Sequence, residues 1–240
     1  MLDAGRGAAP APQFAVECAP PFMTVRFPSS RRTLGWSLLH PGFATVREVV
    51  WVEVRNRDLG PDVDASAFLR QRLADAGLPD ALALMTSRDI RRWRLDATTV
   101  EDVEAACLTT VGLSNGERVG SRFPVRPVPG TVNTLVHVSR PLTDGAFVEA
   151  ISIAAQSRTA AILDAHPPHS GQRITGTGTD CIVVAAPIEG AATQWAGLHT
   201  AVGEAIGAVV YRATREGAEE WFAEFAPARP REGTSTLSTV

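Results

Sequence analysis

The chain has 240 residues and a formal net charge of −3, and all 23 of its basic side chains are arginine. This near balance of charge gives no overall field that would favour nucleic acid or an anionic membrane, so we expect neither as a partner. The absence of lysine excludes a Schiff-base or nucleophilic lysine.

Cysteine use and hydropathy indicate the compartment. Cys18, Cys107 and Cys181 are widely spaced and form no pair motif, which argues against a disulfide framework or a zinc site and is typical of a reducing compartment. We see no signal-peptide pattern and no apolar run of the ~18 residues that a membrane helix needs. The sequence therefore predicts a soluble, cytoplasmic protein.

Composition predicts one folded unit between two disordered ends. Residues 1–20 are rich in Ala, Pro and Gly, and both this segment and residues 227–240 are expected to be disordered. A compact chain of this length buries roughly 70% of its unfolded surface. Residues 21–226 are therefore predicted to form a single domain.

The folded part is expected to begin with three strands. Phe22–Phe27 and Thr33–Leu39 alternate apolar and polar residues, and Pro28–Ser30 is the predicted turn between them. Val46–Val54 is expected to be a third strand with both faces partly covered, because apolar residues occupy both of its faces.

A helix and a hairpin are predicted next. Asp62 or Asp64 is a suitable N-cap, and Gly77 supplies the stop signal for the helix. Leu82–Thr86 and Ile90–Leu95 are close enough in the chain to form a hairpin.

Two buried strands with polar residues follow. Val103–Val111 leads directly into Gly112–Gly116, and loops at strand ends are where layered folds often place ligands. Gly130–Val138 is a strand with Asn133 inside its apolar run. A buried amide must find hydrogen-bond partners, so Asn133 either ties neighbouring backbone together or faces a substrate.

The last third of the chain predicts two helices around a loop and a strand. The longest helix is expected at Asp144–Asp164, and the final one at Leu198–Arg215. Between them lie the loop Thr175–Asp180 and the apolar run Cys181–Ala186. We predict an α+β or α/β fold in which layered mixed β-sheets are flanked by about three main helices.

The loop Thr175–Asp180 alternates glycine and threonine and ends in an acid. Glycines let a ligand approach the backbone closely, and neighbouring N–H groups can cradle an anion or a developing oxyanion. A strand entry that needs glycine, with Asp180 capping a turn, explains the same residues. The loop fits neither a dinucleotide fingerprint nor a P-loop.

Four stretches of the chain together resemble one known family. They are Thr110–Asn115 followed by Gly120, Gly130–Val136, Thr175–Val184, and the set Gly197, His199, Thr200, Gly203, Glu204, Ile206 and Gly207. Over about residues 32–212 they are similar to the adenosylcobinamide amidohydrolases, enzymes of corrinoid salvage. The chain departs from the family pattern at residues 195–198, where a second glycine is expected before the histidine.

The resemblance implies hydrolysis of the amide between the corrin ring and aminopropanol of adenosylcobinamide, which gives adenosylcobyric acid. It implies acid–base chemistry by Asp180, His199 and Glu204. The substrate-binding residues that it implies are Ser114, Asn115, Asn133, Thr177, Gly178, Thr179 and Thr200. The expected partner is the corrinoid itself, and we expect no metal or cofactor of the protein's own, because the cobalt belongs to the substrate.

Several alternatives stay open at this stage. A covalent route would use Thr110, Ser114 or Thr179 as nucleophile, but activated water ranks first because none has an obvious base nearby in the sequence. Cys181 is expected to be a packing residue, and a structural role for Glu204 has equal weight.

The function itself has two alternatives, a corrinoid-binding protein without activity and an amidohydrolase of a different amide. The candidates for contact with a large flat corrinoid are Trp36, Trp51, Trp93 and Trp195. The oligomeric state is left open.

Overall fold

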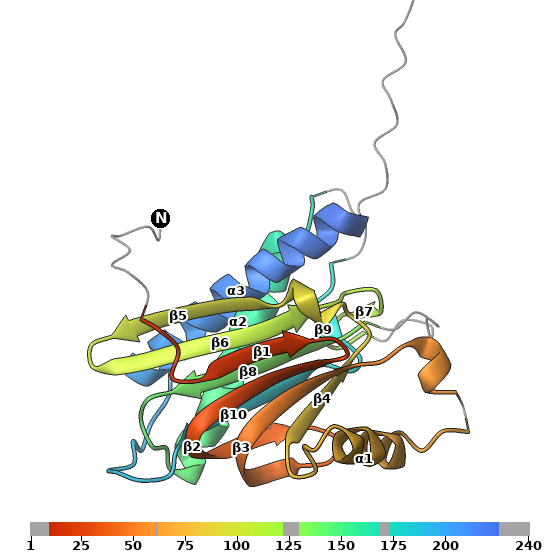
Figure 1. Ribbon diagram of the computed structural model, residues 1–240. Coiled ribbons are helices and arrows are strands. Elements are labelled where there is room, and N and C mark those ends of the chain that lie inside the picture. The colour runs from red at the N-terminus through yellow and green to blue at the C-terminus, as the bar shows by residue number, and fades with distance from the viewer. Residues whose placement is uncertain (1–9, 61, 122–129, 169–172, 226–240) are drawn as a thin grey trace, which may run out of the picture.

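An eight-stranded mixed sheet forms the centre of the computed structural model, which describes residues 10–60, 62–121, 130–168 and 173–225 (Figure 1). Its strands are β1 (Ala15–Ala19), β2 (Phe22–Trp36), β3 (Pro41–Glu53), β4 (Leu82–Thr86), β5 (Arg94–Val100), β6 (Val103–Val111), β8 (Val132–Val138) and β10 (Cys181–Pro187). The order across the sheet is β4-β3-β2-β10-β8-β6-β5, and β1 pairs with β2. The short strands β7 (Gly116–Glu117) and β9 (Gly176–Thr177) form a separate pair.

Three helices flank the sheet, namely α1 (Ala65–Asp75), α2 (Asp144–Ala165) and α3 (Ala201–Phe225). In Figure 1, α2 and α3 lie together behind the sheet, whereas α1 lies beside β3 and β4. The predicted α+β class with about three main helices is thereby confirmed. No helix among the described residues is long and apolar enough to cross a membrane.

One face of the sheet packs against α2 and α3. Alternate residues of β10, such as Ile182 and Val184, join Val136 of β8 in a core that includes Phe147 of α2 and Ile206 of α3. This alternation follows from the two-residue repeat of a strand. The intervening residues of β8 and β10 face the other side, where the candidate site lies.

The other face is concave, because the sheet curls back on itself. Residues of β2, β3 and β4 share a second core with residues of β6, β8 and β10, among them Trp51, Leu108 and Val183. The edge strand β4 comes close enough to β8 for the side-chain amide of Asn133 to donate to the Met85 carbonyl at 2.7 Å. A flat sheet of this order would hold β4 and β8 apart, since three strands separate them.

The N-terminal strands differ from the prediction. Phe22–Phe27 and the first four residues of Thr33–Leu39 belong to one strand, β2, which ends at Trp36. Pro28–Ser30 is not a turn, because a shift in register between Arg26 and Arg31 absorbs the irregularity. Residues 15–19, expected to be disordered, pair with β2 as β1. Residues 1–9 and 226–240 lie outside the described residues.

The predicted hairpin of Leu82–Thr86 with Ile90–Leu95 is wrong. β4 pairs in parallel with β3, and β5 pairs with β6, so the two segments are on opposite edges of the sheet. Helix α1 connects β3 to β4, and a helical crossover is the usual connection between parallel strands. Residues 90–92 form a short 3₁₀ turn instead of strand.

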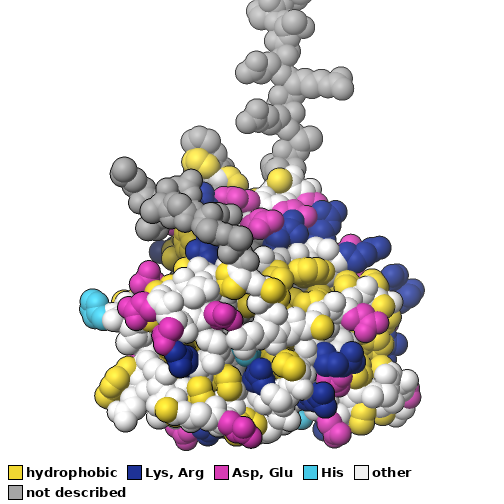
Figure 2. Space-filling model, turned by 60° about the vertical axis from the view of Figure 1, so that its left-hand side comes forward, with side chains coloured by type: hydrophobic (Ala, Val, Ile, Leu, Met, Phe, Trp, Pro, Cys, Tyr) yellow, Lys and Arg dark blue, Asp and Glu magenta, His cyan; other side chains and the backbone are white. Residues whose placement is uncertain are grey.

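Helix α3 begins three residues later than predicted and ends at Phe225, ten residues beyond the expected Arg215. Its C-terminal part is held by ion pairs in which Arg88, Arg92 and Arg94 meet Glu220 and its neighbours. Figure 2 shows acidic and basic side chains gathered together near the base of the grey C-terminal trace. These pairs bring the end of α3 over the same end of the sheet as the candidate site.

Candidate active site

A cleft of about 870 Å³ lies on the concave side of the sheet, where β6 ends and β8 and β10 begin. Its lining comes from these strand ends and from β4, the end of β2 and the start of α1. The lining residues are Trp36, Ser37, Leu38, Val54, Arg55, Leu59, Ala65, Ala83, Leu84, Met85, Thr86, Ser87, Asn115, Gly130, Thr131, Asn133, Gly178, Thr179, Asp180 and Cys181. The volume is in the range of small-molecule sites.

Strand register brings distant segments together at this end. Asn133 of β8 lies between Thr110 of β6 and Cys181 of β10. The backbone N–H of Gly112 donates to Thr131 O at 3.0 Å and so continues the ladder past β6. Three of the four stretches that carry the family resemblance therefore meet at the cleft.

Asp180 is the best-connected polar side chain of the site. Its Oδ1 accepts from the Val132 N–H at 3.0 Å and from the Thr177 hydroxyl, and its Oδ2 accepts from the Thr177 N–H at 3.0 Å. Arg158 of α2 pairs with Oδ2 at 3.1 Å, and the Asp180 side chain is only 6% exposed. A carboxylate offers about four lone-pair sites, so these four donors occupy them.

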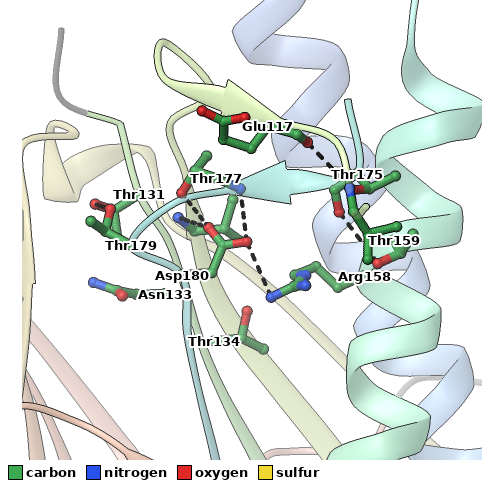
Figure 3. Close-up of polar contacts among 12 residues, drawn as sticks. Glu117, Thr131, Asn133, Thr134, Arg158, Thr159, Thr175, Thr177, Thr179 and Asp180 are labelled. Carbon is green, nitrogen blue, oxygen red and sulfur yellow. Dashed lines mark hydrogen bonds and ion pairs between the residues drawn. The ribbon is translucent and has the colours of Figure 1, made fainter. Parts of the chain in front are cut away.

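Figure 3 shows how these groups are arranged around Asp180. Arg158 reaches it from α2 on one side, whereas Thr131, Thr179 and Asn133 lie on its other side. The carboxylate therefore separates a buried arginine from a group of neutral polar side chains in the cleft.

Glycine is required at two close approaches. A Cβ on Gly176 would come within 2.5 Å of Asp180 Oδ2, and a Cβ on Gly130 would come within 2.7 Å of Asn115 Oδ1 and of the Ser114 nitrogen. These distances are shorter than real Cβ contacts. Any side chain at either position would displace the polar groups of the site.

Two threonine hydroxyls are coupled in the cleft. Thr179 Oγ1 lies 2.9 Å from Gly130 O and 3.0 Å from Thr131 Oγ1. Because a carbonyl only accepts, the Thr179 hydroxyl donates to it and the Thr131 hydroxyl donates to Thr179. Among the described contacts, the lone pairs of Thr131 Oγ1 stay uncommitted.

Two further groups of the site are a buried acceptor without a hydrogen bond and a protonated thiol. Asn115 Oδ1 is buried and receives no hydrogen bond in the part of the chain that the structure describes. Burial is the main cause that raises the pKa of the Cys181 thiol to about 11, and the nearby Asp180 carboxylate adds to it. The thiol stays protonated near neutral pH, which makes it a poor nucleophile.

The structure brings seven of the ten predicted site residues together. Asn115, Asn133, Gly178, Thr179 and Asp180 line the cleft. Ser114 and Thr177 lie behind it: the Ser114 backbone packs on Gly130, and the Thr177 hydroxyl is committed to Asp180. Thr110, a possible nucleophile, is fully buried and does not line the cleft.

His199, Thr200 and Glu204 are at the opposite end of the sheet. Thr200 lines a smaller hollow of about 390 Å³ together with Val103, at the start of β6. The cleft is at the other end of that nine-residue strand, which places the two hollows about 27 Å apart at 3.4 Å per residue. His199 and Glu204 are exposed there. These three residues do not share a site with Asp180.

The fourth stretch of the resemblance has a structural explanation. Thr200 Oγ1 accepts from the Gly203 N–H at 2.9 Å, as an N-cap does, and donates to Gly197 O at 2.8 Å. A Cβ on Gly203 would lie 2.1 Å from Gly197 O. These residues therefore form the start of α3, and that role explains their spacing in the sequence.

Sequence reasoning missed two kinds of contributor. Thr131 was noted only as part of a strand and of a stretch that carries the family resemblance, and its hydroxyl contact with Thr179 depends on the register of β8 and β10. Arg158 is one of many polar residues on a long helix, and no local pattern marks it as the partner of Asp180. Trp36 was one of four candidate tryptophans, and only the structure separates it from the others.

Comparison with known proteins identifies the family of the chain. A model of the family described as "Adenosylcobinamide amidohydrolase" matches residues 9–225. A protein of Halobacterium salinarum with that same name is 31% identical over 168 residues, which cover 66% of this chain and 68% of the relative.

Other similarities are more limited. An uncharacterised protein of Methanocaldococcus jannaschii is 37% identical over 90 residues, which span 36% of this chain and about a third (35%) of that protein. A solved β-aminopeptidase of Burkholderia sp. is 11% identical with a TM-score of 0.41, covering 84% of this chain and 78% of its own. A Pyrococcus horikoshii structure, the PH0078 protein, is 9% identical with the same TM-score, covering 85% of this chain and 77% of its own.

Proposed function

Because the chain belongs to the adenosylcobinamide amidohydrolase family, and is therefore a hydrolase, we propose that it cleaves the amide that joins the corrin ring to aminopropanol in adenosylcobinamide. The products are adenosylcobyric acid and free aminopropanol, and the reaction would serve cobalamin salvage. We place this reaction in the cleft at the ends of β6, β8 and β10.

One observation carries the proposal. Three separate stretches that resemble the family, within 110–115, 130–136 and 175–184, supply eight of the residues that line a single cleft. A set of motifs that served only the fold would have no reason to gather their polar side chains at one hollow. The cleft is also large enough for part of a bulky ligand.

The polar floor offers the contacts that an amide needs. Asn133 keeps one amide hydrogen and its Oδ1 beyond the bond to Met85 O, so it can hold the substrate amide from both sides. Asn115 Oδ1 is buried and receives no hydrogen bond from the described residues, so it would accept from the amide N–H only if the side chain turns toward the cleft when substrate binds. The Thr131 and Thr179 hydroxyls lie where a polarised carbonyl oxygen or an attacking group can be placed.

Proton transfer is assigned to Asp180. It is the single carboxylate among the described residues of the cleft lining, but four donors already occupy its oxygens. We propose that the Thr177 hydroxyl gives up its bond to Asp180 when substrate binds. Oδ1 then takes the proton of the attacking group and passes it to the departing amine.

Two attacking groups fit this arrangement. In the first route, water attacks the carbonyl carbon and the C–N bond breaks as the amine is protonated. In the second route, Thr179 Oγ1 forms an ester with the corrinoid acyl group while aminopropanol leaves, and water then hydrolyses that ester. Thr179 is the more exposed residue of the coupled pair, since it is classed as exposed whereas Thr131 is only 8% exposed.

The test is to incubate the purified protein with adenosylcobinamide, with and without a chelator, and to follow adenosylcobyric acid by mass. Product in both samples supports the proposal, including the expectation that the protein needs no metal of its own. Product lost on chelation would show that a metal is required. Corrinoid binding without product would favour the non-catalytic binding protein.

A second measurement separates the two routes. Rapid acid quench followed by intact-protein mass would show a corrinoid ester on the protein only in the covalent route. Hydroxylamine would divert that ester to a hydroxamate. Thr179→Ser should keep the adduct and Thr179→Val should lose it.

A further inference from the structure

The cleft has two chemically different parts. Its polar floor is formed by Thr131, Asn133 and Thr179, which lie together beside Asp180 (Figure 3). Much of its remaining lining, called here the wall, is apolar and includes Leu38 and Met85. A ligand that fits both parts would join a polar group, such as an amide, to a broad apolar surface.

Trp36 is the tryptophan that the structure places at this wall. Trp51 is fully buried in the core, and Trp195 lines the small hollow at the other end of the sheet. Trp93 packs against the concave core, and Trp221 packs against aromatic neighbours on α3. All five tryptophans of the chain are within the described residues, and Trp36 alone among them lines the cleft.

The Trp36 ring is held in place although 45% of the residue is exposed. Its indole Nε1 donates to the Asp180 carbonyl at 2.6 Å. Its backbone pairs with Pro41 at the end of the β2–β3 ladder. The preceding Gly35 sits so close to β10 that a Cβ there would lie 2.7 Å from Ile182 O. The ring is therefore fixed beside Asp180 and the start of β10.

This anchoring leaves one kind of interaction for a ligand. The only polar atom of the indole is already satisfied, so its exposed surface offers aromatic carbon. A ring that is already ordered costs little conformational entropy when a ligand stacks on it. Leu38, which is 46% exposed, extends the same apolar wall.

We propose that Trp36 determines substrate specificity by stacking against a flat conjugated face of the ligand, while the ligand's amide lies over the polar floor. The hydrogen bond from Trp36 to Asp180 sets the distance between the stacked face and the floor. The identity of the ligand rests on the proposed function. In adenosylcobinamide, both the corrin ring and the adenine offer such a face.

The test is the equilibrium dissociation constant of adenosylcobyric acid, the proposed product, because it measures binding without turnover. Trp36→Leu should raise this Kd about 10-fold, since it removes the aromatic face. Trp36→Phe keeps a face and should stay within about 3-fold. Trp195→Leu, an exposed tryptophan at the far hollow, is the control and should leave Kd unchanged. With adenosylcobinamide, Trp36→Leu should raise KM while kcat stays nearly constant.

Two further probes identify the stacked face. Trp36 dependence in the binding of adenosine alone would assign the indole to the adenine. The same dependence for cyano-ligated cobyric acid, which lacks the adenosyl group, would assign it to the corrin ring. Either result supports stacking.

Equal Kd increases for Trp36→Phe and Trp36→Leu, with equal losses of unfolding free energy, would overturn the inference, because the indole would then only tie β2 to Asp180. Product formation with a Kd that is indifferent to Trp36→Leu would also overturn it and leave the proposed hydrolysis intact. Trp36-dependent binding without any product would refute hydrolysis and leave the inference standing. If the unsubstituted protein binds none of these probes, both fail.

Discussion

The ion pair between Arg158 and Asp180 should be strongly coupled in a double-mutant cycle. The two side chains are 15% and 6% exposed and their charged atoms are 3.1 Å apart. Asp180→Asn removes the negative charge, leaves Arg158 uncompensated and turns an acceptor away from the Thr177 N–H. Breaking a buried pair from one side costs about 3–5 kcal/mol.

Arg158→Met should cost less, about 1–3 kcal/mol, because three donors still serve the carboxylate after the arginine is removed. The double variant buries no unpaired charge, so its loss should be smaller than the sum of the two single losses by at least about 1.5 kcal/mol. Free energies of unfolding would be taken from urea curves followed by circular dichroism, with m-values required to agree.

The matched control is the pair Arg215 and Glu219 on α3, which are 47% and 51% exposed. It should show no measurable coupling, because surface ion pairs are screened by water. Losses at Asp180 and Arg158 that add within about 0.5 kcal/mol would refute the view that this buried pair fixes the floor of the cleft.

Three further predictions test separate parts of the account. Burial, with help from the Arg31 charge, lowers the pKa of His137 from 6.5 to about 3. Between those values the unfolded chain binds one more proton than the folded chain, so the free energy of unfolding should fall by about 2 kcal/mol from pH 7 to pH 5. His137→Gln, measured by urea unfolding at both pH values, should remove most of that loss. An unchanged pH dependence of the free energy of unfolding would contradict the assignment. Gly203→Ala should strongly destabilise α3, because its Cβ would meet Gly197 O at 2.1 Å. Gly207→Ala is the matched control: its nearest contact would be 3.4 Å away, so it should be tolerated or stabilising by up to about 1 kcal/mol. Equal melting temperatures for the two variants would argue against this helix start. Cys181→Ala should retain kcat within about 3-fold. In the unsubstituted protein the Cys181 thiol should resist iodoacetamide at pH 7.5, because the thiol stays protonated. Rapid inactivation by alkylation of Cys181 would show that the thiol is exposed and reactive.

Local sequence signals predicted the elements that local forces determine. The helix from Asp144 is confirmed, with Thr143 Oγ1 accepting from the Ala146 N–H at its start. Val103–Val111 and the end of Gly130–Val138 are buried strands as expected, since runs of β-branched and apolar residues seldom stay exposed.

The errors arose where a distant segment decides the outcome. Pro28–Ser30 has turn chemistry, but pairing on both sides of it keeps β2 continuous. The hairpin expected at Leu82–Leu95 does not form, because α1 returns the chain so that β4 pairs with β3. Strand partners depend on the topology of the whole sheet, which no window of neighbouring residues contains.

The site was predicted in part for the same reason. Asn133 was found because a polar amide interrupts an apolar run, and Thr179 and Asp180 because their glycine–threonine loop precedes an apolar strand and resembles the family. His199 and Glu204 belong to a stretch that is equally well patterned, but its pattern starts a helix: Thr200 caps α3 and Gly203 lets the preceding loop pack on it. A sequence motif alone does not reveal at which end of a sheet its residues will lie.

The most direct test of the account is to measure the rate of adenosylcobyric acid release from adenosylcobinamide by the unsubstituted protein, Thr179→Val and His199→Ala in parallel. We expect release by the unsubstituted protein, a fall of about 100-fold for Thr179→Val, and a rate within about 2-fold for His199→Ala, which lies at the opposite end of the sheet from the cleft. Full activity of Thr179→Val together with loss of activity in His199→Ala would place the chemistry at the start of α3 and contradict the account.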